Sequence, residues 1–393
     1  MASRSPHGLR VLIISPDYPP AQGGIQTLVG VLAERLPVAA VRVVTLDSPG
    51  AGEYDGARPV DVRRVRRGAG RRRFRMAGLG ARAIAEALRF SPDVALVGHV
   101  AASPVGAALR RGPRIPVVTY VHAEEFRVWP RRSAFAMRHS DRVIAVSRHS
   151  ARMARDAGAD PGRVDLVHHG VDLPPAGNGN GNGNGNGAGN GNGNGAGDRA
   201  AHAPTAITVA RMRDAHKGHD VMLRAMPIVL ERVPDARWVV LGDGPLRAGY
   251  ERAAADLAIQ TSVRFCGAVP DAERDRWLGR AHVFAMPTRV PAGGLGGEGF
   301  GIAYLEAAAH GLPVVAANEG GALDAVDDGR TGLLVDPRDP AEVARALVSL
   351  LGDLARAEAM GRDATAWAER FTWQATADRV ADVLSAAAGG AAR

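Results

Sequence analysis

Short apolar runs alternate with longer mixed segments along the whole chain. In the first half, runs rich in valine and isoleucine predict buried strands at residues 9–15, 40–46, 93–99, 115–122 and 142–147. Helical patterns lie between them, for example at residues 26–36 and 80–90. Strands that alternate with helices predict a parallel sheet that helices cover on both faces.

The second half repeats this alternation without repeating the sequence. Strands are predicted at residues 205–211, 236–242, 263–267, 283–287, 313–318 and 332–336. Helices are predicted at residues 218–232, 245–257, 271–281, 301–310, 340–351 and 373–388. The fold class is therefore α/β, with two Rossmann-like domains, and we expect a cleft between them that strand ends and helix N-termini face.

A tract between the two halves contains only glycine, asparagine and alanine from residue 176 to residue 197. It has no apolar residue to bury, so we expect a flexible linker or loop over residues 176–199, with a span of roughly 26 Å. This places the N-terminal domain at residues 1–175 and the C-terminal domain at residues 200–372.

Composition narrows the class of protein. The 393 residues suit two domains, and 46% of them are hydrophobic. Cys266 is the only cysteine, which excludes an intrachain disulfide and favours a reducing, cytoplasmic compartment. No apolar run approaches the roughly 18 residues of a membrane span, and the apolar run at residues 11–14 is too short for a signal peptide. The net charge is +8, and Lys217 is the single lysine beside 48 arginines.

Two motifs follow strands and favour phosphate. In "SPDYPPAQGGIQTL", Gly23 and Gly24 open a helix, whose free N–H groups can bind an anion; a tight turn is the alternative. In "VARMRDAHKGHD", Arg211 and Lys217 bracket a strand end and a helix start, where two cations can hold a diphosphate. The alternative is a solvated basic loop, but a lone lysine in so arginine-rich a chain favours a tight pocket.

The stretch "GEGFGIAYLEAAAHGLPVV" places two glutamates around a helix start. Glu298 precedes the helix and Glu306 lies within it. Glu298 is either a cap of the helix or, with Glu306, one of two carboxylates that bind paired hydroxyls, such as those of a sugar or a ribose. The segment "NEGGALDAV" at residues 318–326 offers another Gly-Gly pair at a possible helix start.

The remaining features are a histidine, a basic run and several absent motifs. His122 ends a strand, where a lone histidine is more often structural than functional. Residues 62–76 hold eight arginines; they form a solvated loop or dock on anionic lipid, and no motif supports nucleic acid. The sequence has no phosphate loop of the GxxxxGK[ST] type, no Asp-x-Asp and no His/Cys cluster with metal spacing.

Taken in order, these motifs resemble the retaining glycosyltransferases of family GT4, which have the GT-B fold. The resemblance covers roughly residues 10–390 outside the Gly/Asn tract, and the E-x7-E motif from Glu298 to Glu306 is its most specific element. "SPDYPPAQGGIQ" and "FAMPTRVPAGGLGGEGFGIAYLE" are especially similar to the PimB-like phosphatidylinositol mannosyltransferases, which use GDP-mannose. Leu323 and Asp324 stand where Pro-Glu is usual, which leaves the identity of the sugar open.

The resemblance implies a role for each motif. Arg211 and Lys217 would hold the donor diphosphate, and Glu306 would hold the ribose hydroxyls. Glu298 would contact the sugar hydroxyls, beside the amides of residues 299–301. These amides are those of Gly299, Phe300 and Gly301. His122 would contact the sugar from the N-terminal domain. Gly23 and Gly24 would line the cleft near the phosphate and the acceptor. The final helix, within residues 373–393, would return to the N-terminal, acceptor-side domain, while the C-terminal domain would bind the donor.

The sequence therefore predicts retaining transfer of a hexose, with mannose favoured, from a nucleotide diphosphate sugar to an acceptor hydroxyl. The acceptor would be an anionic lipid or glycolipid at the inner membrane surface, and Arg211, Lys217, His122 and Glu298 would form the catalytic set. We expect no metal, no further cofactor and no obligate protein partner. Two rivals stay open: a UDP-sugar enzyme with a soluble acceptor, and a non-catalytic protein that binds a nucleotide-sugar or an anionic surface. An oxidoreductase is disfavoured because no G-x-G-x-x-G follows the first strand.

Overall fold

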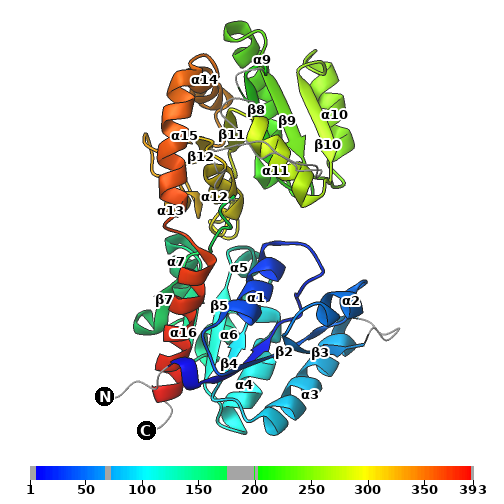
Figure 1. The fold of residues 1–393 in the computed structure, drawn as a ribbon, viewed down its shortest axis with the longest axis vertical. Coiled ribbons are helices and arrows are strands. Elements are labelled where there is room, and N and C mark those ends of the chain that lie inside the picture. The colour runs from blue at the N-terminus through cyan, green and yellow to red at the C-terminus, as the bar shows by residue number, and fades with distance from the viewer. Residues whose placement is uncertain (1–5, 67–71, 175–198, 200–201, 391–393) are drawn as a thin grey trace, which may run out of the picture. The chain divides into compact units, whose positions relative to one another are not determined.

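The structure is a computed structural model that describes residues 6–66, 72–174, 199 and 202–390. The chain forms two compact units: unit 1 comprises Met1–Gly170 with Trp373–Arg393, and unit 2 comprises Val171–Thr372 (Figure 1). Apart from Arg199, the expected linker at residues 176–199 lies outside the described residues.

Unit 1 contains a parallel sheet of seven strands in the order β3-β2-β1-β4-β5-β6-β7. Their bounds are β1 Arg10–Ile14, β2 Ala40–Leu46, β3 Asp61–Val65, β4 Val94–Val97, β5 Val117–Val121, β6 Arg142–Ala145 and β7 Val164–Leu166. The five predicted strands are confirmed, but the two edge strands β3 and β7 were not predicted. Neither β3 nor β7 contains a fully buried residue, so both lack the apolar run that marks a central strand.

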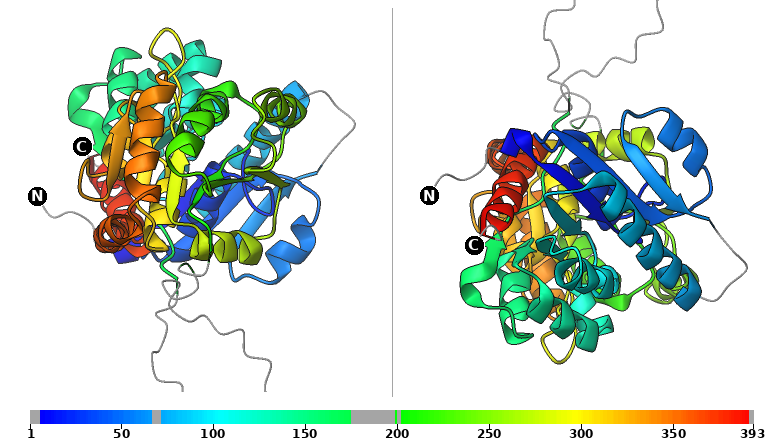
Figure 2. Two further views of the ribbon diagram at one scale, coloured as in Figure 1. Left: turned by 90° about the horizontal axis from the view of Figure 1, so that it is seen from above. Right: turned by 90° about the horizontal axis from the view of Figure 1, so that it is seen from below.

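Helices surround this sheet, and the last of them comes from the far end of the chain. The helices of unit 1 are η1 Pro6–Gly8, α1 Gly24–Arg35, α2 Ala51–Gly56, α3 Arg72–Phe90, η2 Val100–Ala102, α4 Ser103–Arg111, α5 Glu124–Val128, α6 Pro130–His139, α7 Arg148–Asp156, η3 Pro161–Arg163 and α16 Trp373–Gly390. Helix α16 packs against α1 and against η1 at the start of the described chain (Figure 2). Apolar side chains of α3 and α4 fill a core beneath β1, β2, β4 and β5.

Helix α3 starts eight residues before the predicted helix at residues 80–90. The basic run at residues 62–76 is therefore not one loop, because its first part is in β3 and its last part is in α3. Residues 67–71 of that run lie outside the described residues. Consecutive arginines at the start of α3 interrupt the apolar periodicity, which hid this part of the helix in the sequence.

Unit 2 contains a parallel sheet of six strands in the order β10-β9-β8-β11-β12-β13. Their bounds are β8 Thr205–Val209, β9 Arg237–Leu241, β10 Val263–Gly267, β11 Val283–Met286, β12 Val314–Ala317 and β13 Gly332–Val335. All six predicted strands are confirmed. Each unit thus has one sheet of parallel strands with helices, which confirms the predicted α/β fold class.

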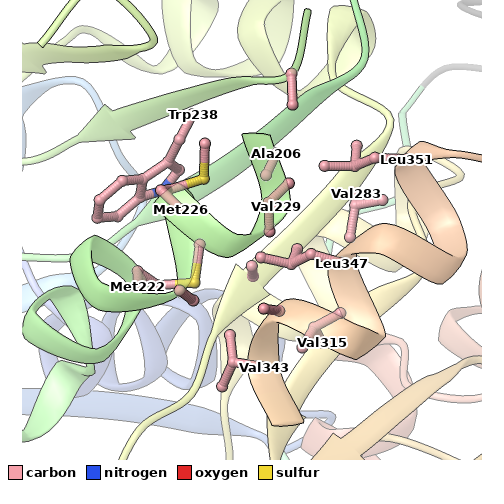
Figure 3. Close-up of a cluster of buried hydrophobic side chains, with 14 of the residues drawn as sticks. Ala206, Met222, Met226, Val229, Trp238, Val283, Val315, Val343, Leu347 and Leu351 are labelled. Carbon is pink, nitrogen blue, oxygen red and sulfur yellow. The ribbon is translucent and has the colours of Figure 1, made fainter. Parts of the chain in front are cut away.

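The helices of unit 2 follow the predicted ones closely. They are η4 Ala215–Lys217, α9 His219–Arg232, α10 Arg247–Asp256, α11 Asp271–Arg280, α12 Ile302–Ala309, α13 Ala322–Ala325, α14 Pro340–Leu351 and α15 Leu354–Ala368. The bounds of α14 match the prediction, whereas α15 was not predicted. Helices α9 and α14 pack together, and their apolar side chains point toward β8, β11 and β12 in the core of this unit (Figure 3).

The strand order of each sheet fixes where its functional loops meet. In unit 2, β8 and β11 are neighbours in the middle of the sheet. The strands β9 and β10, which follow β8 in the chain, lie on one side of this pair, and the strands that follow β11 lie on the other side. In unit 1 the corresponding neighbours are β1 and β4. Ligands of open α/β sheets bind at the carboxyl ends of such strands, because the following loops diverge there and leave a crevice.

Leu347 of α14 tests the core of unit 2, because its side chain is fully buried. We predict that Leu347→Ala lowers the free energy of unfolding by about 2–5 kcal/mol, as measured by urea denaturation. The control is Leu257→Ala, at a leucine that is 39% exposed, with an expected change within about 0.5 kcal/mol. Equal effects of the two substitutions would contradict this description of the core.

Candidate active site

An ion pair in unit 2 joins two residues that the sequence marked separately. The Lys217 Nζ lies 2.7 Å from Glu298 Oε2 and donates a hydrogen bond to it. Lys217 follows β8 and Glu298 follows β11, so the pair bridges the two neighbouring strands where the sheet order reverses. Both side chains are partly buried, at 25% and 17% exposure, which leaves each open to a ligand.

A glycine allows the two loops to approach this closely. Gly218 has a φ of +83°, and a Cβ there would lie 2.3 Å from the carbonyl oxygen of Pro287. A side chain at this position would therefore push the loop after β8 away from the loop after β11. The close approach of the two backbones sets the distance between Lys217 and Glu298.

An arginine that the sequence analysis missed fastens the same two loops. Arg289 forms two hydrogen bonds to the carboxylate of Asp220, at 2.9 and 2.8 Å, and a third to the carbonyl oxygen of Ala215 at 2.7 Å. Two parallel N–H···O bonds fix orientation as well as distance. Arg289 follows a predicted strand and lies beside a glycine-rich loop, and this position was a signal from which the sequence could have predicted it.

The histidine behind Lys217 is neutral. His219 is fully buried and stacks on Tyr250, with the ring centres 5.2 Å apart. Burial, and then the charge of Lys217, lowers the pKa of His219 to about 4. The positive charge at this strand end therefore belongs to the lysine and not to the imidazole.

The glycine-rich loop that carries Glu298 is braced by the second Gly-Gly pair. The N–H of Gly321 donates to the carbonyl oxygen of Glu298 at 3.0 Å. A Cβ on Gly321 would lie 2.3 Å from the carbonyl oxygen of Gly299. The segment 318–326 therefore supports the loop, and its helix α13 has only four residues.

Glu298 does not cap the helix that follows it. The N-cap of α12 is Gly301, with a φ of +102°, and no side chain caps this helix. The cap interpretation is therefore wrong, because the Glu298 carboxylate is directed to Lys217. Within the described part of the chain, the N–H groups of Gly299 and Gly301 donate to no protein acceptor. Phe300 between them is buried and packs on Phe371.

Glu306 has a different partner. It lies in the second turn of α12, and its Oε1 is 3.8 Å from Nη1 of Arg274 in α11. Burial raises the pKa of Glu306, and Arg274 opposes that shift. The two glutamates of the E-x7-E motif thus lie beside different cations.

Arg211 is exposed and has no carboxylate partner among the residues that the structure describes. It follows β8, and the backbone around it packs tightly on a glycine-rich turn. A Cβ on Gly242 would lie 2.1 Å from the carbonyl oxygen of Ala210. The guanidinium is therefore available to an anion at the same sheet edge as Lys217.

In unit 1, Gly23 and Gly24 lie at the start of α1. Gly23 is the N-cap with a φ of +149°, and no side chain caps this helix. Gln26 in the first turn donates to Asp17 Oδ1 at 3.2 Å. The helix start therefore leaves backbone N–H groups uncapped at the carboxyl end of β1.

His122 lies at the carboxyl end of β5 and is buried. Its Nε2 is 3.4 Å from the carbonyl oxygen of Gly98, and its ring stacks on Tyr120 with 5.6 Å between ring centres. Burial lowers the pKa of His122 to about 4, so the imidazole is neutral at physiological pH. Glu125, three residues later, was missed by the sequence analysis, although an acid so close to a strand-end histidine was a usable signal.

The described residues contain neither a metal-binding cluster nor a membrane-spanning helix. No group of three histidine, cysteine, aspartate or glutamate side chains in the described ranges is placed to hold a metal ion. Among the helices of the same ranges, none combines the length and apolar character needed to cross a membrane.

Comparisons with known proteins agree with this architecture. A family model described as "Glycosyl transferases group 1" matches residues 203–353, and one described as "Glycosyltransferase Family 4" matches residues 22–174. Two solved structures share the fold: Anabaena HepE in complex with UDP, and sucrose-phosphate synthase from Thermosynechococcus elongatus. HepE has a TM-score of 0.77 and 19% identity over 96% of this chain and 100% of that one. The synthase has a TM-score of 0.73 and 21% identity over 94% and 96%.

Curated relatives match nearly the whole chain. The chain is 31% identical over 385 residues to the GDP-mannose-dependent alpha-(1-6)-phosphatidylinositol monomannoside mannosyltransferase of Mycolicibacterium smegmatis. The match covers 95% of this chain and 98% of that protein. The protein of the same name from Mycobacterium tuberculosis is 30% identical over 388 residues, with the same coverage. The chain therefore belongs to glycosyltransferase family 4 and is a glycosyltransferase of the GT-B fold.

Proposed function

We propose that this glycosyltransferase moves mannose from GDP-mannose, with retention of configuration, to a hydroxyl of a phosphatidylinositol glycolipid. The observation that carries the proposal is the Lys217–Glu298 contact of 2.7 Å at the carboxyl ends of β8 and β11. It stands in a chain that matches GDP-mannose-dependent mannosyltransferases over almost its whole length.

Lys217 and Arg211 would stabilise the donor diphosphate. Negative charge grows on this leaving group in the transition state, and fixed cations at that position lower its energy. In the protein alone the Glu298 carboxylate holds the ammonium of Lys217 in place. When the donor binds, the lysine keeps that position and a phosphate oxygen becomes its second partner.

Glu298 and the loop N–H groups would hold the sugar. A carboxylate accepts hydrogen bonds from two neighbouring hydroxyls, and the N–H groups of Gly299 and Gly301 are available for a third oxygen. Glu306 would accept from the ribose hydroxyls, and the charge of Arg274 opposes the rise in the pKa of Glu306 that burial causes. The loop before α12 and the helix itself would thus bind separate parts of one donor.

Unit 1 would supply the acceptor side and His122. A neutral imidazole can donate a hydrogen bond to the sugar without repelling the positive oxocarbenium-like transition state. Gly23 and Gly24 would bring the backbone close to the phosphate. No side chain is assigned as nucleophile or base; a donor phosphate oxygen would take the acceptor proton, and the cations named above would replace a metal.

A surface of α3 favours a membrane-bound acceptor. Phe74, Ala77, Ala81, Ile84 and Leu88 are all exposed, and their spacing of three and four residues puts them on one stripe of the helix. Phe74 and Leu88 are 59% and 68% exposed. We name these five residues the α3 stripe and propose that it inserts into the surface of an anionic bilayer, so that the enzyme acts as a peripheral membrane protein.

Charge distinguishes a bilayer from a second copy of the chain as the occupant of the α3 stripe. Helix α3 contains five arginines and one glutamate, Glu86. That glutamate is nearly buried and already paired with Arg42 and Arg82. A second copy would bring two helices with an excess of positive charge together, whereas anionic lipid attracts a basic residue near its surface by about 1 kcal/mol.

Lys217 provides the test of the donor site. We predict that Lys217→Ala lowers kcat/KM for GDP-mannose about 100-fold, because the diphosphate loses a partly buried cation. Lys217→Arg should lower kcat/KM less than Lys217→Ala does, because arginine keeps the positive charge although its side chain is larger. Initial rates of lipid mannosylation from GDP-mannose measure both.

The control for Lys217 is Arg232→Ala, which removes an exposed cation from the other end of α9 and should leave kcat/KM unchanged. The diphosphate role is contradicted if Lys217→Ala lowers kcat/KM less than about three-fold.

The α3 stripe provides the test of membrane binding. We predict that the double substitution Phe74→Ser, Leu88→Ser weakens co-sedimentation with phosphatidylinositol-containing vesicles at least ten-fold. Burial of each apolar side chain in the bilayer contributes about 1.5–3 kcal/mol to binding, and the variant lacks both contributions. Binding of the unaltered chain should also fall in 1 M salt, where the Debye length is about 3 Å. Ile228→Ser, at an exposed apolar residue of α9, is the control. Salt-insensitive binding, or no binding by the unaltered chain, would count against this surface.

A further inference from the structure

A buried carboxyl in unit 1 joins the ends of two strands beside His122. Glu125 is the second residue of the short helix α5 and is only 3% exposed. Its Oε2 accepts the N–H of His122 at 2.8 Å, directly after β5. Its Oε1 accepts the N–H of Val100 at 2.8 Å, shortly after β4. One side chain thus fixes both backbones at the carboxyl edge of the sheet.

A histidine extends this network to the loop after β1. His99 Nδ1 lies 3.3 Å from Glu125 Oε1 and accepts the N–H of Ala101 at 3.0 Å. A neutral His99 therefore carries its proton on Nε2, which lies 3.9 Å from Asp17 Oδ2. Asp17 belongs to the loop that leads to Gly23 and Gly24 and is bound there by Gln26.

We propose that Glu125 is a positioning residue of sugar transfer, which holds the loops after β1, β4 and β5 in one arrangement around His122. The inference rests on the proposed function, since it assigns His122 to the sugar. Glu125 would not contact the substrate; it would act through the backbone of His122 and through the orientation of His99.

The protonation of Glu125 follows from its surroundings. Burial raises the pKa of Glu125 to about 8; the two backbone N–H groups oppose this shift and the charge of Asp17 adds to it. The charged or titratable groups that face it are Asp17, His99 and His122, and within the described residues no arginine or lysine pairs with it. A protonated carboxyl can donate to His99 Nδ1 and share its one lone pair with the N–H of Ala101, whereas a carboxylate would face that lone pair without a proton between them. The network is therefore complete below about pH 8 and is disrupted above it.

The raised pKa of Glu125 makes the stability of the folded chain depend on pH. The pKa of Glu125 is raised on folding, so between its ordinary value and about 8 the unfolded chain binds fewer protons than the folded one. The contribution of Glu125 to stability thus decreases as pH rises through this window, by at most about ten-fold in the folding constant per pH unit. Above about pH 8 it stays constant.

The experiment compares the full chain with Glu125→Gln, and with Glu124→Gln as a matched control at the neighbouring, 39% exposed carboxylate. Glutamine keeps the shape and remains neutral, but its amide nitrogen cannot accept the N–H of Val100. We expect kcat to fall about ten-fold at pH 7 with the KM for GDP-mannose within two-fold, because a misplaced loop affects the transition state more than donor binding. In the unaltered chain, kcat should fall above about pH 8 with a single ionisation.

Urea unfolding between pH 5 and 9 gives a second, activity-independent result. The unaltered chain and Glu124→Gln should lose stability with rising pH relative to Glu125→Gln. The role of Glu125 is overturned if the free energy of unfolding depends on pH in the same way in all three chains. It is also overturned if Glu125→Gln leaves both kcat at pH 7 and the fall of kcat above about pH 8 unchanged. If the unaltered chain transfers nothing from GDP-mannose, the proposed function fails instead, and the unfolding result still decides how Glu125 is protonated.

Discussion

The site of unit 2 depends on the contact between the Lys217 ammonium and the Glu298 carboxylate. That contact exists because β8 and β11 are neighbours in the sheet although more than seventy residues separate them in the chain. Gly218 lets the two loops touch, and Arg289 with Asp220 prevents them from separating. The opposed charges hold each other in place while both remain partly exposed, so under the proposed function a donor would find its cation and its hydroxyl acceptor already positioned.

Unit 1 uses the same principle with a different chemistry. Its loops also meet where the strand order reverses, but the residue that fastens them is a buried carboxyl with no cationic partner among the described residues. Backbone N–H groups take the place of the arginine, and burial keeps the group close to neutral. A neutral His122 beside a largely neutral Glu125 would suit the proposed role of His122 at a sugar ring on which positive charge develops.

The sequence predicted most of the framework and only part of the site. Central strands are recognisable because both of their faces are buried, which makes them continuous apolar runs; the edge strands β3 and β7 lack that signal. Lys217 and Glu298 were each marked by local patterns, but their contact depends on the sheet order, which no local pattern encodes. The interpretation of Glu298 as a cap was wrong because Gly301, in a left-handed conformation that glycine adopts readily, is the N-cap of α12 and no side chain caps the helix. Glu125 escaped notice because its function depends on burial and on partners from two distant strands.

The most direct test of the account identifies the product of the reaction. The full chain is incubated with GDP-mannose and vesicles that contain a phosphatidylinositol monomannoside, and the lipid is then characterised by mass spectrometry and by the NMR coupling of the new anomeric carbon. The account predicts one added hexose in the α configuration, the configuration of the donor. A β-linked product would contradict retention, and product formed only from a UDP-sugar would contradict the assignment of the donor.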